Sequence, residues 1–110
     1  MNQRDLEAEV IAWGKERNIF EQSDALAQGK VVREEALELV DELVWYAANM
    51  CDPRRADDAK KELGDVIFSS IMCAETMNTT IGECLELAIE KNKNRKGKMV
   101  NGKWTKESDL

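Results

Sequence analysis

Two pairs of acidic side chains have the spacing that a metal site needs. Glu35 and Glu38 lie three residues apart, and Glu62 and Asp65 repeat that spacing further along the chain. Residues three apart on a helix are neighbours on one side, with Cβ atoms about 5–6 Å apart. If the two helices are antiparallel neighbours, the pairs can meet. Four carboxylates in one place raise one another's pKa values, so a divalent cation would stabilise them.

The absence of histidine narrows the chemistry of such a site. The chain has no histidine, which removes the commonest zinc ligand and the usual general base. Carboxylates alone suit a hard cation, so we expect Mg²⁺ as the cofactor, with Mn²⁺ as a substitute. In a chain that is 35% charged, a single acidic pair is usually a solvated helix face. Two pairs on consecutive helices, both beside apolar stripes, favour the metal site.

A basic segment near the C-terminus could supply phosphate contacts. Residues 91–106 contain seven basic residues and no acidic one, whereas the other 94 residues hold nine basic and 22 acidic residues, a net charge of −13. The acidic part is a poor surface for nucleic acid, because phosphate attraction dominates such binding. Lys91, Lys93 and Arg95 could bind the phosphates of a nucleotide. The alternative is that this segment folds back on the acidic part of its own or a neighbouring subunit.

The spacing of apolar residues predicts the helices that would carry these groups. Gly29 marks a bend or a separate first turn in the second helix. Residues 66–74 of the third helix carry no charge, so we expect this stretch to be buried nearly all round. We expect four helices, at residues 3–17, 24–49, 53–78 and from 81 into the basic segment.

Capping residues support these boundaries. Ser23 or Asp24 can cap the second helix and Asp52 can cap the third. Thr80, with a glutamate three residues later, begins the fourth helix as a capping box. We expect Gly97 to end that helix.

Short connections between the helices favour an antiparallel bundle. We therefore expect an all-α fold in a single domain of residues 1–110, with a four-helix bundle-like protomer. The Asn101-Gly102 pair lies between apolar residues, which is typical of a hairpin or turn in a short C-terminal tail. A chain of this size buries a limited core, so helix packing into a dimer or a dimer of dimers would help it.

The remaining composition indicates a cytoplasmic protein with no membrane partner. The three cysteines, Cys51, Cys73 and Cys84, show no metal-binding spacing and are expected to be small buried residues in a reducing compartment. The N-terminus is polar, and no apolar run approaches the roughly 20 residues of a membrane span.

The order of the acidic pairs resembles a known signature. Glu35-Ala36-Leu37-Glu38, followed after 23 residues by Glu62-Leu63-Gly64-Asp65, resembles the MazG-like branch of the all-α nucleoside triphosphate pyrophosphohydrolases. The basic segment with its Gly102-Lys103-Trp104 end resembles the C-terminal region of small, single-domain members. The likeness covers most of the chain from about Trp13 onward.

The resemblance implies a Mg²⁺-dependent hydrolase. The expected reaction cleaves a (deoxy)nucleoside triphosphate between the α and β phosphorus atoms, giving a monophosphate and pyrophosphate. It implies a homodimer or homotetramer with the nucleotide near a subunit contact. It also implies the following residues: Glu35, Glu38, Glu62 and Asp65 for the metal, and Lys91, Asn92 and Arg95, beside Lys93, for the phosphates.

Two further roles are assigned from residue types. Either Glu38 or Glu34 could orient or deprotonate the attacking water. Trp45 or Tyr46, about two turns after Glu38 on the helix, could stack a nucleobase, and Trp13 and Trp104 are further candidates. An aromatic residue at helical spacing is more often part of a core or an interface.

Two other functions are compatible with the same sequence. One is a non-catalytic helical interaction module whose acidic face binds a basic partner. The other is a sensor that binds metal or nucleotide without turnover. Metal titration separates the module from the enzyme, because the module predicts no metal affinity.

Overall fold

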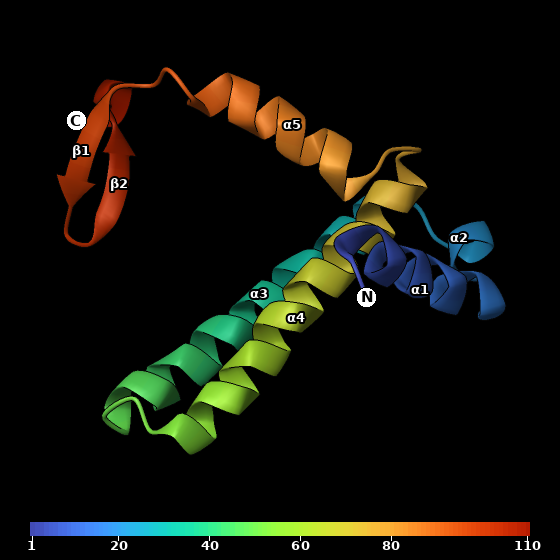
Figure 1. Ribbon diagram of the computed structural model, residues 1–110, viewed down its shortest axis with the longest axis horizontal. Coiled ribbons are helices and arrows are strands. Elements are labelled where there is room, and N and C mark those ends of the chain that lie inside the picture. The colour runs from blue at the N-terminus through green and yellow to red at the C-terminus, as the bar shows by residue number, and fades with distance from the viewer.

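The computed structural model describes all residues, Met1–Leu110, and is mostly helical with one small hairpin, as expected (Figure 1). The predicted helices are present, and a short additional helix lies between the first two of them. The elements are α1 (Gln3–Glu16), α2 (Ile19–Gln22), α3 (Ala25–Ala48), α4 (Pro53–Thr76), α5 (Ile81–Asn92), β1 (Gly97–Val100), β2 (Lys103–Lys106) and the 3₁₀ helix η1 (Glu107–Asp109).

The central unit is the antiparallel pair α3 and α4, which lie side by side along their length (Figure 1). Asp24 caps α3, because its carboxylate accepts a hydrogen bond from the Ala27 N–H at 2.8 Å. Asp52 caps α4 in the same manner, and Pro53 occupies the first helical position, where no N–H is required. Each long helix therefore begins where its capping residue satisfies the free backbone donors.

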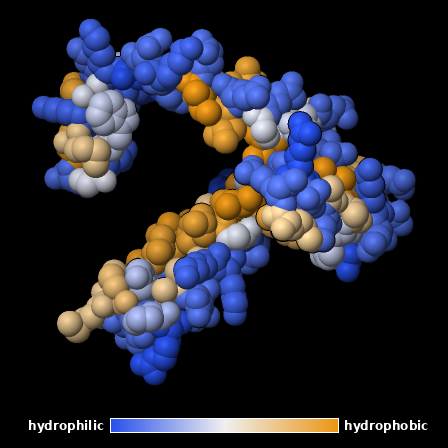
Figure 2. Space-filling model, viewed as in Figure 1, coloured by the Kyte–Doolittle hydropathy of each residue, from blue (hydrophilic) through white to orange (hydrophobic).

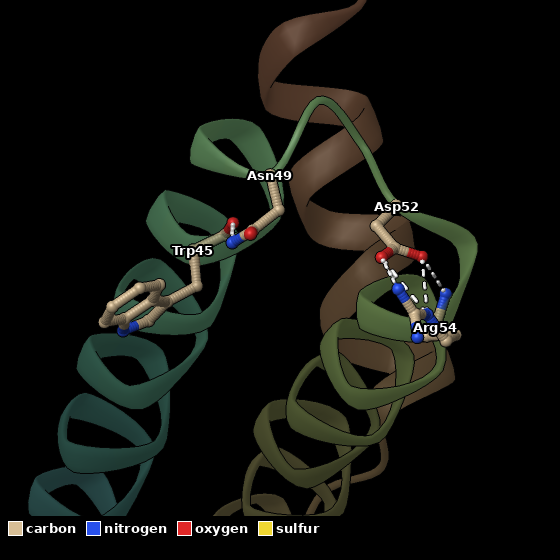
Figure 3. Close-up of polar contacts among 4 residues, drawn as sticks. All are labelled: Trp45, Asn49, Asp52 and Arg54. Atoms are coloured by element: carbon tan, nitrogen blue, oxygen red, sulfur yellow. Dashed lines mark hydrogen bonds and ion pairs between the residues drawn. The ribbon is translucent and has the colours of Figure 1, made fainter.

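A four-residue connection, residues 49–52, reverses the chain between α3 and α4 (Figure 3). The side-chain amide of Asn49 donates to the Trp45 carbonyl at 2.7 Å and closes the end of α3. Across the turn, the Arg54 guanidinium donates to the Asp52 carboxylate at 2.8 Å and holds the pKa of that carboxyl below its usual value. These contacts fix the end of α3 and the start of α4, and the ion pair of Arg55 with Glu42 at 3.6 Å joins the two helices.

The boundaries differ from the prediction in two places. α3 runs through Gly29 without a break, so the alternative of a separate first turn there is wrong; the Ala and Leu residues around this glycine are strong helix formers that outweigh one unfavourable position. α5 ends at Asn92 rather than at Gly97. Gly97 begins β1 instead, where a Cβ would overlap the Thr105 carbonyl of the facing strand.

The predicted C-terminal hairpin is confirmed. β1 and β2 pair antiparallel, with Val100 opposite Lys103. Asn101 and Gly102 form the turn with φ of 51° and 80°. Both positive values belong to the turn type that matches the right-handed twist of paired strands.

The small core lies where α1 crosses the C-terminal half of α4. Gly14 is buried at this crossing, and a Cβ on it would lie 2.8 Å from the Phe20 ring and 2.9 Å from Met72. In the uncharged stretch of α4, residues 66–74, four residues are buried, four are half-buried and Ile67 is 50% exposed, so the expected burial nearly all round is reached only in part. Only six of 110 residues are buried in the chain.

The helices do not close into the expected four-helix bundle within one chain. α5 leaves the end of α4 and, with the hairpin, stands apart from the α3–α4 pair (Figure 1). The radius of gyration is 16.5 Å, whereas a compact domain of this length has about 13 Å. The physical reason is that α5 has no facing helix in its own chain.

Two smaller observations concern the cysteines and membranes. All three cysteines are free thiols, but Cys51 is exposed in the α3–α4 connection, so its expected burial is wrong. Cys73 and Cys84 are half-buried.

None of the helices is both long and apolar enough to cross a membrane.

Candidate metal centre

Three of the four predicted ligands converge between α3 and α4. One carboxylate oxygen from each of Glu35, Glu62 and Asp65 lies within 4.8 Å of the other two. The antiparallel pairing explains this arrangement. Glu35 lies 14 residues before Asn49 and Asp65 lies 13 residues after Asp52, so equal helical rise brings them level on facing helices.

The electrostatics of this cluster disfavour its charged state. Desolvation raises the pKa of Glu35 most, and the charges of Glu38, Asp65 and Glu62 raise it further. Desolvation also raises the pKa of Glu62, followed by the charges of Glu38, Asp65 and other nearby acids. A bound cation would reverse both effects, because an opposite charge stabilises ionised carboxylates.

A hard cation fits the donors that are present. Glu62 Oε2 is buried and has no hydrogen-bond partner, and none of the ion pairs in the chain involves a carboxylate of the cluster. All three donors are carboxylate oxygens, and no cysteine belongs to the group. Oxygen-only ligands suit Mg²⁺ or Mn²⁺ better than softer metals.

The two other predicted glutamates lie at the margin of the cluster. Glu38 is exposed and is not one of the three converging residues, yet its charge raises the pKa of both Glu35 and Glu62. Glu34 is exposed, and its charge is not among the causes of either shift. Of the two candidates for water activation, Glu38 is the one electrostatically coupled to the cluster.

A cavity of about 560 Å³ opens onto the carboxylates. Glu35 and Asp65 form part of its lining, and most of the rest is apolar. Trp13 and Phe68 meet there edge to face, with ring centroids 5.2 Å apart. Gln28 lines the same cavity and donates its amide to the Ser23 hydroxyl at 2.9 Å.

Besides Glu35, Asp65 and Trp13, the residues that line this cavity were not predicted from the sequence. Two of these lining residues, Gln28 and Phe68, could have been predicted from their helical spacing to the acidic residues. Gln28 lies seven residues before Glu35 on α3, and Phe68 lies three residues after Asp65 on α4. Residues at these offsets share a helix face, so both follow from the position of the acidic pairs.

The aromatic residues first expected to stack a base lie elsewhere. Trp45 is 57% exposed and packs against the Arg55 guanidinium, 5.4 Å from the ring centroid. Tyr46 lines a separate apolar cavity with Leu39 and Leu63. Neither residue lines the cavity beside the carboxylates.

The predicted phosphate-binding residues are not brought to the carboxylates of their own chain. Lys91 and Asn92 are exposed at the end of α5, and Lys93 pairs with Glu90 at 2.8 Å. Arg95 lines a small polar cavity at the base of the hairpin. In Figure 1 this end of the molecule stands away from α3 and α4.

Gly64 lies between the cluster residues Glu62 and Asp65, and the space that a side chain would fill at this position is empty. Apart from its chain neighbours and the adjoining helix backbone, no atom of the chain lies within 4 Å of the position that a Cβ would take. Tight packing between helices of one chain is therefore not the reason for this glycine. The remaining expectation is an approach by a ligand or by another chain.

Comparison with known proteins adds one finding. The family model for the MazG nucleotide pyrophosphohydrolase domain matches residues 23–100 of the 110-residue chain. The match includes both acidic pairs and most of the basic segment. No curated protein and no solved structure gives a match.

Proposed function

Because the chain belongs to the MazG nucleotide pyrophosphohydrolase family, we propose that it hydrolyses nucleoside triphosphates between the α and β phosphorus atoms. One observation carries this proposal. Carboxylate oxygens of Glu35, Glu62 and Asp65 converge beside an apolar cavity large enough for a nucleoside. A cation at the carboxylates would face the phosphates while the cavity takes the nucleoside.

Glu35, Glu62 and Asp65 would hold Mg²⁺, with Glu38 beside them as the fourth ligand. When bound, the metal neutralises charge on the phosphates and lowers the pKa of a coordinated water. Because the carboxylates would fix the position of the cation, they would also set where the phosphates lie relative to α3 and α4. The buried, unpartnered Oε2 of Glu62 supports its assignment as a ligand.

Glu38 would orient and deprotonate the attacking water. It is exposed at the edge of the cluster and is not one of the converging three, so it has an oxygen free for this role. The water oxygen bonds to the α phosphorus, and the bond from that phosphorus to the bridging oxygen breaks. The products are a nucleoside monophosphate and pyrophosphate.

The nucleoside would occupy the cavity lined by Trp13 and Phe68. Aromatic faces stack nucleobases without strong sequence preference, at about 1–3 kcal/mol per base. The Gln28 amide donates to Ser23, which leaves its carbonyl oxygen free to accept from a base. This assignment replaces Trp45 and Tyr46, which lie outside the cavity.

The quaternary structure is part of the same proposal. We infer that this single-domain chain works as a homodimer or a homotetramer, because one copy buries only six residues. Nucleic acid is not an expected partner, since the part of the chain outside residues 91–106 has a net charge of −13.

Product analysis tests the reaction directly. Purified protein is incubated with Mg²⁺ and each NTP or dNTP, and the products are separated. We expect equal amounts of monophosphate and pyrophosphate, loss of turnover in Glu62→Gln, and retention in Glu9→Gln, an exposed acid on α1. Release of orthophosphate, or turnover no higher than in Glu62→Gln, contradicts the proposal. Tight nucleotide binding without product would favour a sensor.

A further inference from the structure

We propose that Arg17 is a positioning residue of the site, and that its guanidinium fixes the indole of Trp13 as the wall against which the base of a nucleotide stacks. This inference rests on the proposed function and adds a residue to its nucleoside cavity. Arg17 belongs neither to the carboxylate group nor to the lining of the cavity. Its effect on the nucleotide therefore passes through Trp13.

The first argument is that the Arg17 side chain contacts Trp13 twice. Its guanidinium carbon lies over the indole, 4.1 Å from the ring centroid, and its Nη1 donates a hydrogen bond to the Trp13 carbonyl at 3.0 Å. A planar cation is attracted to the face of an aromatic ring, and its fork of donors can reach a carbonyl at the same time. Because one guanidinium holds both the backbone and the ring of Trp13, it restricts rotation of the indole.

The second argument is that these contacts leave indole surface for a base. Trp13 lines the cavity but Arg17 does not, so the guanidinium covers a part of the ring that is turned away from the cavity. Phe68 meets Trp13 edge to face and lines the cavity with it. The indole is 40% exposed even with both contacts in place. A base that enters the cavity therefore meets a ring that is held but still accessible.

The third argument is that Arg17 occupies the connection between two elements of the cavity wall. α1 supplies Trp13 and α2 supplies Ile19 to the lining. Arg17 is the C-cap residue of α1, and Asn18 then turns the chain with a φ of 54°. Both wall residues precede residue 23, at which the family match begins. The likeness to the family therefore assigns no role to this wall.

The fourth argument is that the indole is the main partner of the guanidinium. In Figure 2 the end of the molecule that α1 and α2 form is mainly hydrophilic, with hydrophobic patches between the polar side chains. The Arg17 side chain is 48% exposed at this border, and its one ion pair, with Glu16, spans 3.7 Å. No close carboxylate holds the charge, so the ring and carbonyl of Trp13 determine where the guanidinium lies.

Binding of nucleoside monophosphates tests this role without turnover. AMP, GMP, CMP and UMP lack the bond between α and β phosphorus, so calorimetric titration with Mg²⁺ present gives a Kd for each. For the nucleotide that wild type binds most tightly, we expect Arg17→Met to raise Kd about two- to fivefold. Arg17→Lys keeps a cation and should recover part of the affinity. The control is Arg4→Met, at an exposed position of the same helix, which should bind as wild type does.

The mobility of the indole provides a second measurement, made on the free protein in EDTA. The substitutions Trp45→Phe and Trp104→Phe leave Trp13 as the only tryptophan, so time-resolved fluorescence anisotropy reports on that ring alone. We expect faster and wider local rotation in Arg17→Met than in this background, and an intermediate value in Arg17→Lys. Loss of a helix cap alone would lower the melting temperature without releasing the ring.

The outcomes separate this proposal from the proposed reaction. In turnover, Arg17→Met should raise KM by the same factor as Kd and leave kcat unchanged. An unchanged Kd in Arg17→Met, or a raised Kd with unchanged rotation of the indole, would overturn the role of Arg17, as would an Arg17→Lys variant no better than Arg17→Met. A wild-type protein that binds monophosphates in an Arg17-dependent manner but hydrolyses no triphosphate would contradict the proposed function instead.

Discussion

Glu35 of α3 and Asp65 of α4 place carboxylate oxygens within 4.8 Å of each other, although 29 residues separate them in the chain. Both line the cavity that contains Trp13. This pair belongs to both the acidic cluster and the lining of the apolar cavity. Substitutions in the cluster and substitutions in the cavity lining should therefore have different effects.

Replacing Asp65 by asparagine should remove activity without unfolding the protein. The change removes a proposed ligand and also one of the like charges that raise the pKa values of Glu35 and Glu62. We expect kcat to fall by about two orders of magnitude or more. The melting temperature in EDTA should stay equal or rise. The control is Asp57→Asn, at an exposed position of α4; a clear fall in melting temperature for Asp65→Asn alone would contradict the repulsion argument.

The metal-free protein should lose stability from the cluster as the pH rises. Glu35 and Glu62 have folded pKa values above the ordinary 4.5, so the folded state holds their protons more tightly than the unfolded state. Their contribution is complete below pH 4.5 and is lost as the pH passes the raised values. Calorimetry in EDTA should show this slope in wild type and a smaller one in Glu35→Gln. Equal slopes would contradict the predicted shift.

Added Mg²⁺ should reverse that pH dependence. Metal ligands must be deprotonated to bind, so affinity rises over the same pH window in which the metal-free cluster loses stability. We expect the increase in melting temperature on adding Mg²⁺ to be larger at pH 8 than at pH 5. Glu62→Gln serves as the control, and the same Mg²⁺ response in that variant would place the bound ion elsewhere.

Gly14→Ala should destabilise the chain, whereas Gly29→Ala should not. A Cβ at Gly14 would lie within 3 Å of Phe20 and Met72, but one at Gly29 would meet nothing within 4 Å. Overpacking of this kind costs about 1–3 kcal/mol, and replacing a free helical glycine by alanine gains about 1 kcal/mol. Urea denaturation of the two variants compares them directly. Similar midpoints would show that α1 does not pack on α4 as described.

Substitution of cavity residues should affect substrate affinity more than substitution of Trp45. Gln28→Ala and Trp13→Leu are expected to raise KM about tenfold, since each removes a contact proposed for the base. Trp45→Ala should leave KM unchanged, because Trp45 lies outside the cavity. Steady-state kinetics with several nucleotides provide the measurement. A larger KM change in Trp45→Ala would restore the original assignment of base stacking.

Local features of the fold were predictable from the sequence. Three helices begin directly after a predicted N-cap residue, namely Asp24, Asp52 or Thr80. The predicted turn at Asn101-Gly102 connects the two strands of the hairpin. These features depend on hydrogen bonds and backbone conformations within a few residues. The three-residue spacing also placed Glu62 and Asp65 on one side of their helix, because helical periodicity is itself local.

Only the tertiary structure decided which of these groups meet. It brought Glu35 to Glu62 and Asp65 while leaving Glu38 at the margin, and it placed Trp13 rather than Trp45 beside them. It also showed that α5 carries the basic segment away from the carboxylates of its own chain (Figure 1). The physical reason is that helix pairing and crossing depend on contacts between distant segments and on connection geometry, which the local pattern of residues leaves open.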